Sequence, residues 1–176
     1  MYVTERCNQA CVFCLEEDGT ALRPDVAPSQ VTEDLRTLRA QGAEHITFMG
    51  GETFLRKDLD QILRQARDLG FTRLGVTTNG SVLGTEGFVT KMIDSGLELV
   101  EISLHADTPE LAALISGKGF TWERQERALT ELETLRPRLT YLIVNVVVCR
   151  ENADRIESIV AGLIERHPKL DPIVKL

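Results

Sequence analysis

The chain has 176 residues and a mass of 19.6 kDa, enough for one domain that buries roughly 70% of its unfolded surface. Hydrophobic residues make up 43% and charged residues 27%, which excludes collagen, low-complexity polymers and wholesale disorder. The net charge of -7 and the pI of about 5.1 argue against a surface that coats nucleic-acid phosphates, although a local basic patch stays open.

Neither a membrane span nor a secretory signal is indicated. The longest nearly unbroken apolar run, residues 141–149, contains Asn145 and is far shorter than the roughly 20 residues that a membrane helix requires. Glu5 and Arg6 stand where a secretory signal would have its apolar segment. We therefore expect no membrane partner and no export.

Short β-branched runs alternate along the chain with amphipathic helical patterns. Glycines 42, 70 and 96 are placed to end helices before the next strand. Helical stripes are predicted around residues 31–38, 59–69, 88–93 and 156–163, and residues 123–133 read as a solvated helix with no assigned role. Strands are predicted at residues 2–5, 45–49, 72–77, 97–104, 139–148 and 173–176.

This alternation predicts an α/β fold in which a parallel sheet is buried under its crossover helices. Periodicity alone leaves two architectures open, a partial barrel and an open doubly wound sheet. Residues 1–176 read as a single domain that starts in its first strand and stops in its sixth, so we expect it to be trimmed at both ends.

Polar and glycine residues follow several of the predicted strands, and in parallel α/β folds these strand ends converge on one rim. The fifth strand carries Asn145 inside it and Cys149-Arg150-Glu151-Asn152 at its end. The segments that follow the first four are Cys7-Asn8-Gln9-Ala10-Cys11-Val12-Phe13-Cys14, Gly50-Gly51-Glu52-Thr53, Thr78-Asn79-Gly80 and Ser103-Leu104-His105. We expect a site on this rim.

Three cysteines at C-x3-C-x2-C spacing, Cys7, Cys11 and Cys14, predict a metal centre. Three thiolates can each bind one iron of a cubane cluster and leave the fourth iron open to a small molecule, by analogy with the vacant position of a catalytic zinc. Two other interpretations stay open: a zinc site completed by Asp18 or Glu16, or three unligated thiols.

The other rim residues each have an ordinary structural interpretation. Gly50-Gly51-Glu52 allows close backbone approach to a ligand and offers a carboxylate to an ammonium group, but it also suits a simple strand-to-helix turn. Asn79-Gly80 marks tight turns anywhere. His105 could bind a ligand or move a proton, or it is a hydrogen-bonded turn residue. Cys149 is expected to be a small buried residue that closes the fifth strand, the alternative being a fourth cluster ligand or a thiol that faces the substrate.

Taken together, these residues resemble the radical S-adenosylmethionine (radical SAM) superfamily over nearly the whole chain. The cysteine loop, with Thr4, Asn8 and Phe13, is similar to the cluster-binding loop of that family. Gly50-Gly51-Glu52 is similar to its methionine-binding motif, and Thr78-Asn79-Gly80 follows its third strand. Ser103-Leu104 and Asn145 stand where its fourth and fifth strands carry similar residues.

The resemblance implies a partial (β/α)6 TIM-like barrel, a parallel sheet with outer helices. It implies a [4Fe-4S] cluster on Cys7, Cys11 and Cys14, with S-adenosyl-L-methionine (SAM) chelating the open iron. Residues 50–52 would hold the methionine ammonium and Phe13 would approach the adenine. Thr78 and Asn79 count with the cofactor-binding residues, and Ser103 with Lys118 would reach the ribose or carboxylate.

The activity that this implies is a radical SAM enzyme whose substrate loses hydrogen to a 5′-deoxyadenosyl radical. Its partners would be a reductant such as flavodoxin or ferredoxin and a peptide or small-molecule substrate. An oxidation-sensitive thiolate loop suits a reducing cytoplasm. The alternative is a non-catalytic iron-sulfur or zinc binding module.

The sequence departs from the family pattern in three places. Thr53 replaces the usual proline after the glutamate, so that loop is less rigid. No cysteine-rich C-terminal segment is present from which auxiliary clusters could be inferred, and residues 161–165 read as helix interior rather than as a glycine-rich adenine motif.

Overall fold

The computed structural model describes residues 1–15, 24–85, 87–117 and 119–176. Within them six strands form one sheet in the order β1-β2-β3-β4-β5-β6, and each neighbouring pair is parallel. The strands are β1 (Tyr2–Thr4), β2 (His45–Gly50), β3 (Arg73–Thr78), β4 (Leu97–Ser103), β5 (Tyr141–Asn145) and β6 (Ile173–Lys175). The predicted parallel α/β fold is therefore confirmed.

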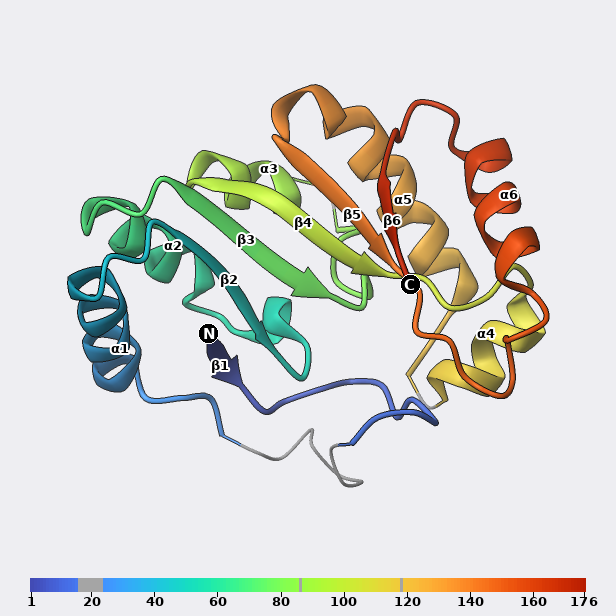
Figure 1. Cartoon of the computed structure of the whole chain (residues 1–176), viewed down its shortest axis with the longest axis horizontal. Helices are drawn as coiled ribbons and strands as arrows, with labels where there is room; N and C mark the ends of the chain where they lie inside the picture. Colours follow the sequence, from blue (N-terminus) through green and yellow to red (C-terminus); the bar gives the residue numbers. More distant parts are fainter. Residues whose placement is uncertain (16–23, 86, 118) are drawn as a thin grey trace.

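Helices lie along the outer side of the curved sheet, as in a partial barrel (Figure 1). Two short 3-10 turns, η2 (Thr53–Leu55) and η3 (Arg136–Arg138), accompany them. The helices are α1 (Pro28–Ala40), α2 (Leu59–Asp68), α3 (Phe88–Asp94), α4 (Pro109–Ser116), α5 (Trp122–Leu135) and α6 (Ile156–Arg166). Between sheet and helices lies the core, in which Val76, Val100 and Val144 of the central strands are fully buried.

The glycine signals in the sequence mark real helix ends. Gly42, Gly70 and Gly96 have φ angles of 90°, 91° and 113°, a region that residues with a Cβ rarely adopt. Each is the second residue after a helix and precedes the next strand. These glycines therefore set the length of three βα units.

The fifth strand is shorter than predicted, because its last backbone groups bond outside the sheet. The amide of Val147 donates to Nδ1 of His105 at 3.1 Å, and the Val147 carbonyl accepts from the Asn152 side chain at 2.9 Å. Cys149 consequently lies beyond the strand and is half-buried, so its expected place at the end of that strand is wrong.

Two helices differ from expectation. Helix α4 is absent from the prediction, although Thr108 caps it by accepting from the Leu111 amide at 3.3 Å and Pro109 opens its first turn. Helix α5, predicted as solvated, buries Ala128, Leu129 and Leu132 against the core. An amphipathic stripe was therefore missed beneath the many charges of that segment.

The segment after β1 crosses from one edge of the sheet toward α4, along the lower side of Figure 1. There the amides of Ala10 and Val12 donate to the carbonyls of Ser116 and Ile115, at 3.1 and 2.9 Å. These carbonyls belong to the last turn of α4, which leaves them without partners inside the helix. The cysteine segment is thus held by β1 where it begins and by α4 at Ala10 and Val12.

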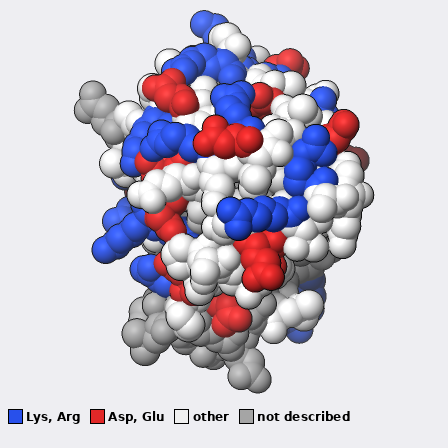
Figure 2. Space-filling model, turned by 90° about the vertical axis from the view of Figure 1, so that its left-hand side faces the viewer, with Lys and Arg blue, Asp and Glu red and all other residues white. Residues whose placement is uncertain are grey.

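Charge of both signs is mixed on the face shown in Figure 2, which is the left-hand side of Figure 1. Ion pairs such as Lys91–Asp60 at 3.0 Å and Arg67–Glu98 at 3.3 Å join neighbouring elements of the fold. This face offers no single-sign field for a polyanion. A search of the described helices found none with the length and apolar character to cross a membrane.

Candidate functional site

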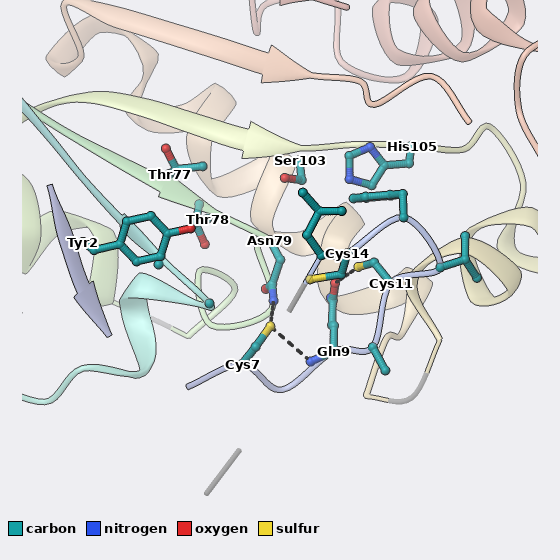
Figure 3. Close-up of a pocket in the computed structure, with 16 residues that line it drawn as sticks. Tyr2, Cys7, Gln9, Cys11, Cys14, Thr77, Thr78, Asn79, Ser103 and His105 are labelled. Carbon is teal, nitrogen blue, oxygen red and sulfur yellow. Dashed lines mark hydrogen bonds between the residues drawn. The ribbon is translucent and has the colours of Figure 1, made fainter. Parts of the chain in front are cut away.

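A cavity of about 960 Å³ opens at the carboxyl ends of the strands, where the sequence predicts a site. Figure 3 shows Ser103 and His105 along its upper side and Cys7 and Gln9 along its lower side. Sixteen residues line it: Tyr2, Cys7, Gln9, Ala10, Cys11, Val12, Phe13, Cys14, Leu15, Gly50, Gly51, Thr77, Thr78, Asn79, Ser103 and His105. Four successive βα units thus contribute to one cavity.

The three clustered cysteines all line this cavity as free thiols. Cys7 and Cys11 are half-buried and Cys14 is exposed, and a turn places the Cys14 amide 2.9 Å from the Cys11 carbonyl. The sulfur of Cys7 accepts from the Gln9 amide at 3.5 Å. The structure therefore places the three residues predicted to bind metal around one cavity.

Burial raises the pKa of the Cys7 thiol, and the negative charges of Glu52 and Cys14 add to that rise. Burial, followed by the charges of Cys7 and Cys14, raises the pKa of Cys11 to about 12. Without a cation these side chains stay protonated at neutral pH. A metal centre would supply the positive charge that three adjacent thiolates need, and its binding would release protons.

The turn after β2 packs against the chain that leads to the cysteines. The Gly51 amide donates to the Thr4 carbonyl at 3.1 Å, and the Glu52 amide donates to the Arg6 carbonyl at 2.6 Å. A Cβ at Gly50 would lie 2.0 Å from the Thr4 oxygen, and one at Gly51 would lie 2.3 Å from the Arg6 oxygen. Only glycines permit this approach, which brings two backbone segments of the cavity wall together.

The carboxylate of Glu52 is fully buried and engaged within the protein. Its Oε1 accepts from the Phe54 amide at 3.0 Å and from the Thr78 hydroxyl at 2.7 Å, and its Oε2 accepts from the Asn79 amide at 2.6 Å. Burial raises the pKa of this carboxyl, while these hydrogen bonds oppose the rise. Glu52 is outside the cavity lining, so its contact with an ammonium group stays a prediction.

Asn79 connects the end of β3 to the cysteine loop. Its side-chain nitrogen Nδ2 donates to Oδ1 of Asn8 at 3.0 Å and reaches the Cys7 sulfur at 3.8 Å. Its side-chain oxygen Oδ1 accepts from the backbone amide of Ser81 at 2.9 Å. Asn8 donates in turn to the Ser81 hydroxyl at 2.8 Å. Two motifs more than 70 residues apart in the chain therefore form one hydrogen-bonded unit.

Phe13, Ser103 and His105 complete the lining. The ring of Phe13 meets the ring of His105 edge to face, with centroids 4.7 Å apart. Burial lowers the pKa of His105 to about 4, so its imidazole is neutral at pH 7. Because Nδ1 accepts from the Val147 amide, the proton of the neutral ring is on Nε2.

Other predicted residues lie elsewhere. Asn145 pairs with Ser103 across β4 and β5 but does not line the cavity. Lys118 and the alternative zinc ligands Glu16 and Asp18 fall outside the described residues. Gly117 and Gly119, which flank Lys118, pack on the cysteine loop: a Cβ would lie 2.5 Å from the Ala10 oxygen and 1.8 Å from the Asn8 oxygen, respectively.

Several functional residues were missed in the sequence. Tyr2 and Thr77 line the cavity without having been predicted, and Gln9 was expected on the rim only as part of the cysteine segment. Fully buried Asn152 donates to the carbonyls of His105 and Val147, each at 2.9 Å, and so holds the loop after β5 against the end of β4. The alternation of side chains along β1 and β3 could have indicated Tyr2 and Thr77, whereas Asn152 was expected on the rim after the fifth strand but was given no role.

The three thiols suit an iron-sulfur cluster. Within the part of the chain that the structure describes, no three His, Cys, Asp or Glu side chains are grouped closely enough for one metal ion. In a cubane each cysteine binds a different iron, which needs three sulfurs around a wider space. The three thiols line one large cavity, which offers such a space.

Fold and site together define an α/β protein with a three-cysteine cavity at the carboxyl ends of its parallel strands. The family model of the Radical SAM superfamily matches residues 1–161. The chain therefore belongs to that superfamily, as the resemblance in its motifs led us to expect.

Known relatives and solved structures agree with this assignment. A probable GTP 3′,8-cyclase of Methanothermobacter thermautotrophicus is 28% identical over 148 residues, which cover 84% of this chain and 47% of the relative. Streptococcus suis SuiB bound to precursor peptide SuiA has a TM-score of 0.74 at 20% identity, over 94% of this chain and 36% of SuiB.

A third comparison is the radical SAM methyltransferase TsrM of Kitasatospora setae, solved with cobalamin and a [4Fe-4S] cluster bound. Its TM-score is 0.69 at 18% identity, over 94% of this chain and 34% of TsrM. These structural similarities show the fold, a partial barrel shared by radical SAM enzymes. The chain spans about half the length of the curated relatives that it matches.

Proposed function

We propose that this chain is the core of a radical SAM enzyme that holds a [4Fe-4S] cluster on Cys7, Cys11 and Cys14 and binds SAM beside it. One observation carries the proposal: the three thiols, the close-packed Gly50-Gly51 turn and Asn79 all line a single cavity. Membership of the superfamily and the bound cluster of TsrM support it.

When bound, the cluster supplies one electron that cleaves SAM to methionine and a 5′-deoxyadenosyl radical, which abstracts hydrogen from the substrate. The residues of the chain orient the reactants and exclude water, since hydrogen abstraction requires the target carbon close to the 5′ carbon. The electron comes from an external reductant such as flavodoxin or ferredoxin.

Each group of cavity residues then has its own role in binding SAM. The turn at Gly50 and Gly51 would present backbone groups to the methionine ammonium, with Glu52 behind it. Phe13 would lie against the adenine, where its ring is already oriented by the edge-to-face contact with His105. Ser103 and Lys118 would reach the ribose or the carboxylate, and Thr78 with Asn79 would close the wall between the glycine turn and the cysteines.

A small molecule is the substrate class that the relatives favour over a peptide. Two curated relatives, each 28% identical to this chain, are named probable GTP 3′,8-cyclases, whereas the peptide complex of SuiB is a similarity of fold at 20% identity. We propose a nucleoside triphosphate as the first candidate to test. A reducing compartment such as the cytoplasm suits the free thiols.

The test is anaerobic reconstitution with iron and sulfide, addition of SAM and dithionite, and chromatographic assay of 5′-deoxyadenosine. We expect deoxyadenosine from the unmutated protein and none from a Cys7→Ala control. Iron without deoxyadenosine, or zinc without iron after anaerobic isolation, would support a non-catalytic binding module instead. In a second arm GTP is added to the same reaction, and we expect it to increase the formation of deoxyadenosine. No increase would exclude GTP as the candidate substrate.

A further inference from the structure

We propose that the Asn79 side chain, held in place by Glu52, tunes the reduction potential of the cluster through an N–H···S hydrogen bond to Cys7. This inference rests on the proposed cluster. It assigns the glutamate of the Gly50-Gly51-Glu52 segment a positioning role within the protein.

Asn79 is oriented by contacts on both its backbone and its side chain. Its backbone amide donates to Glu52 at 2.6 Å, and its Oδ1 accepts from the Ser81 amide at 2.9 Å. Since Oδ1 is occupied by a donor, the NH2 group must face the opposite direction, toward Asn8 and the Cys7 sulfur. Figure 3 shows this contact with Cys7, next to the one from Gln9.

Glu52 supports this arrangement from inside the fold. Its buried carboxylate binds the Thr78 hydroxyl and the Asn79 amide, which are consecutive residues at the end of β3. A buried carboxylate with three donors is costly to leave unpaired, so it fixes the backbone at residues 78 and 79 tightly. The position of the Asn79 side chain therefore depends on Glu52.

Hydrogen bonds to the sulfurs of an iron-sulfur centre are one of the means by which a protein sets its potential. Reduction by one electron adds negative charge that spreads onto the thiolate sulfurs. An N–H dipole directed at Cys7 stabilises that charge and raises the potential. Removing the donor therefore makes the centre harder to reduce.

The variant Asn79→Ser tests this directly. Serine keeps a short polar group that can accept from the Ser81 amide, but it has no donor long enough to reach the sulfur. At a fixed potential we expect the ratio of reduced to oxidised cluster to fall about three- to tenfold, tenfold being 59 mV for one electron. The measurement is a redox titration of the SAM-free cluster followed by electron paramagnetic resonance.

Ser81→Ala is the matched control. It removes a hydroxyl that contacts Asn8 and leaves the backbone amide that binds Asn79. We expect its potential to equal that of the unmutated protein. An unchanged or raised potential in Asn79→Ser, or an equal shift in both variants, would overturn the assignment.

The role of Glu52 is tested by a double-mutant cycle. Glu52→Gln removes a charge near the cluster and also disturbs Asn79, and these two effects oppose each other in sign. In the Asn79→Ser background only the charge effect persists, so the shift caused by Glu52→Gln should be more negative in the native background. Equal shifts in both backgrounds would refute the coupling.

Asn79→Asp covers the case in which serine prevents cluster assembly, because aspartate keeps the turn acceptor and lacks the amide donor. Its potential should also fall, and by more than the three- to tenfold change expected for serine, because aspartate adds a negative charge beside the cluster as well as removing the donor. Loss of the cluster from both variants, with the fold intact by circular dichroism, would overturn a role in tuning and assign Asn79 to assembly. If the unmutated protein binds no iron, the proposed function itself fails, which is a distinguishable result.

Discussion

Replacing Gly51 by alanine tests the close contact between the glycine turn and the chain that leads to the cysteines. The new Cβ would lie 2.3 Å from the Arg6 carbonyl oxygen and 2.6 Å from its carbon, both rigid backbone atoms. Restoring an ordinary van der Waals distance requires the two segments to separate by about 1 Å. That movement also stretches the bond from the Glu52 amide to the same oxygen, now 2.6 Å.

The expected cost combines both effects. Overpacking costs about 1–3 kcal/mol and the weakened hydrogen bond about 0.5–1.5 kcal/mol, so we expect a loss of about 2–4 kcal/mol in the free energy of unfolding. For a chain of this size the melting temperature then falls by about 4–16 °C. The assay is thermal and urea unfolding of the metal-free protein under reducing conditions.

Gly162→Ala makes the same chemical change within helix α6. Its Cβ would meet only the end of the flexible Arg166 side chain at 2.9 Å, and alanine favours a helix interior by about 0.5–1 kcal/mol. This control should therefore be neutral or stabilised. If Gly51→Ala unfolds at the same urea concentration as the unmutated protein, the two backbone segments are not in the contact described.

Two further predictions concern the cavity. Cys11→Ala should abolish cluster binding, measured as iron and sulfide per chain after reconstitution. The control Cys149→Ala lies outside the cavity and should retain the full complement of iron and sulfide. A full complement of iron in Cys11→Ala would contradict the assignment of Cys11 as a ligand. The pKa of His105 is about 4 in the folded protein and 6.5 in the unfolded chain. Below pH 6.5 the unfolded chain therefore binds a proton that the folded protein does not, and the contribution of His105 to stability falls as the pH falls toward 4. His105→Asn, whose Oδ1 can accept from the Val147 amide, should lose less stability than the unmutated protein between pH 7 and pH 5, as measured by urea unfolding; equal losses would contradict the buried neutral imidazole.

The repeating βα pattern was sufficient to predict the sheet, because strand periodicity and helix-ending glycines are local signals. The rim was predictable for the same reason, since parallel strands bring their carboxyl ends to one edge. Helix α4 was missed although Thr108 and Pro109 form a recognisable start. Its segment is only eight residues long and carries apolar side chains on more than one side, since Ala112 and Ile115 are buried whereas Leu114 is 58% exposed.

The direction of each side chain at the rim could not be predicted. Glu52 was expected to face a ligand, and in the structure its carboxylate is turned into the protein toward Thr78 and Asn79. That orientation depends on how the second and third βα units meet, which is a tertiary property. The same holds for Asn152, whose hydrogen bond to the His105 carbonyl joins the loop after β5 to the end of β4, while its other two lie within that loop.

The attachment of the cysteine segment to α4 has a consequence for biosynthesis. Ser116, which accepts the amide of Ala10, follows it by 106 residues. At about 5–20 residues per second, the ribosome reaches Ser116 roughly 5–20 s after it has added Ala10. During that interval the three thiols are part of a nascent chain that lacks the hydrogen bonds from Ala10 and Val12 to α4. The order of translation therefore places formation of the metal-binding loop after synthesis of the fourth βα unit.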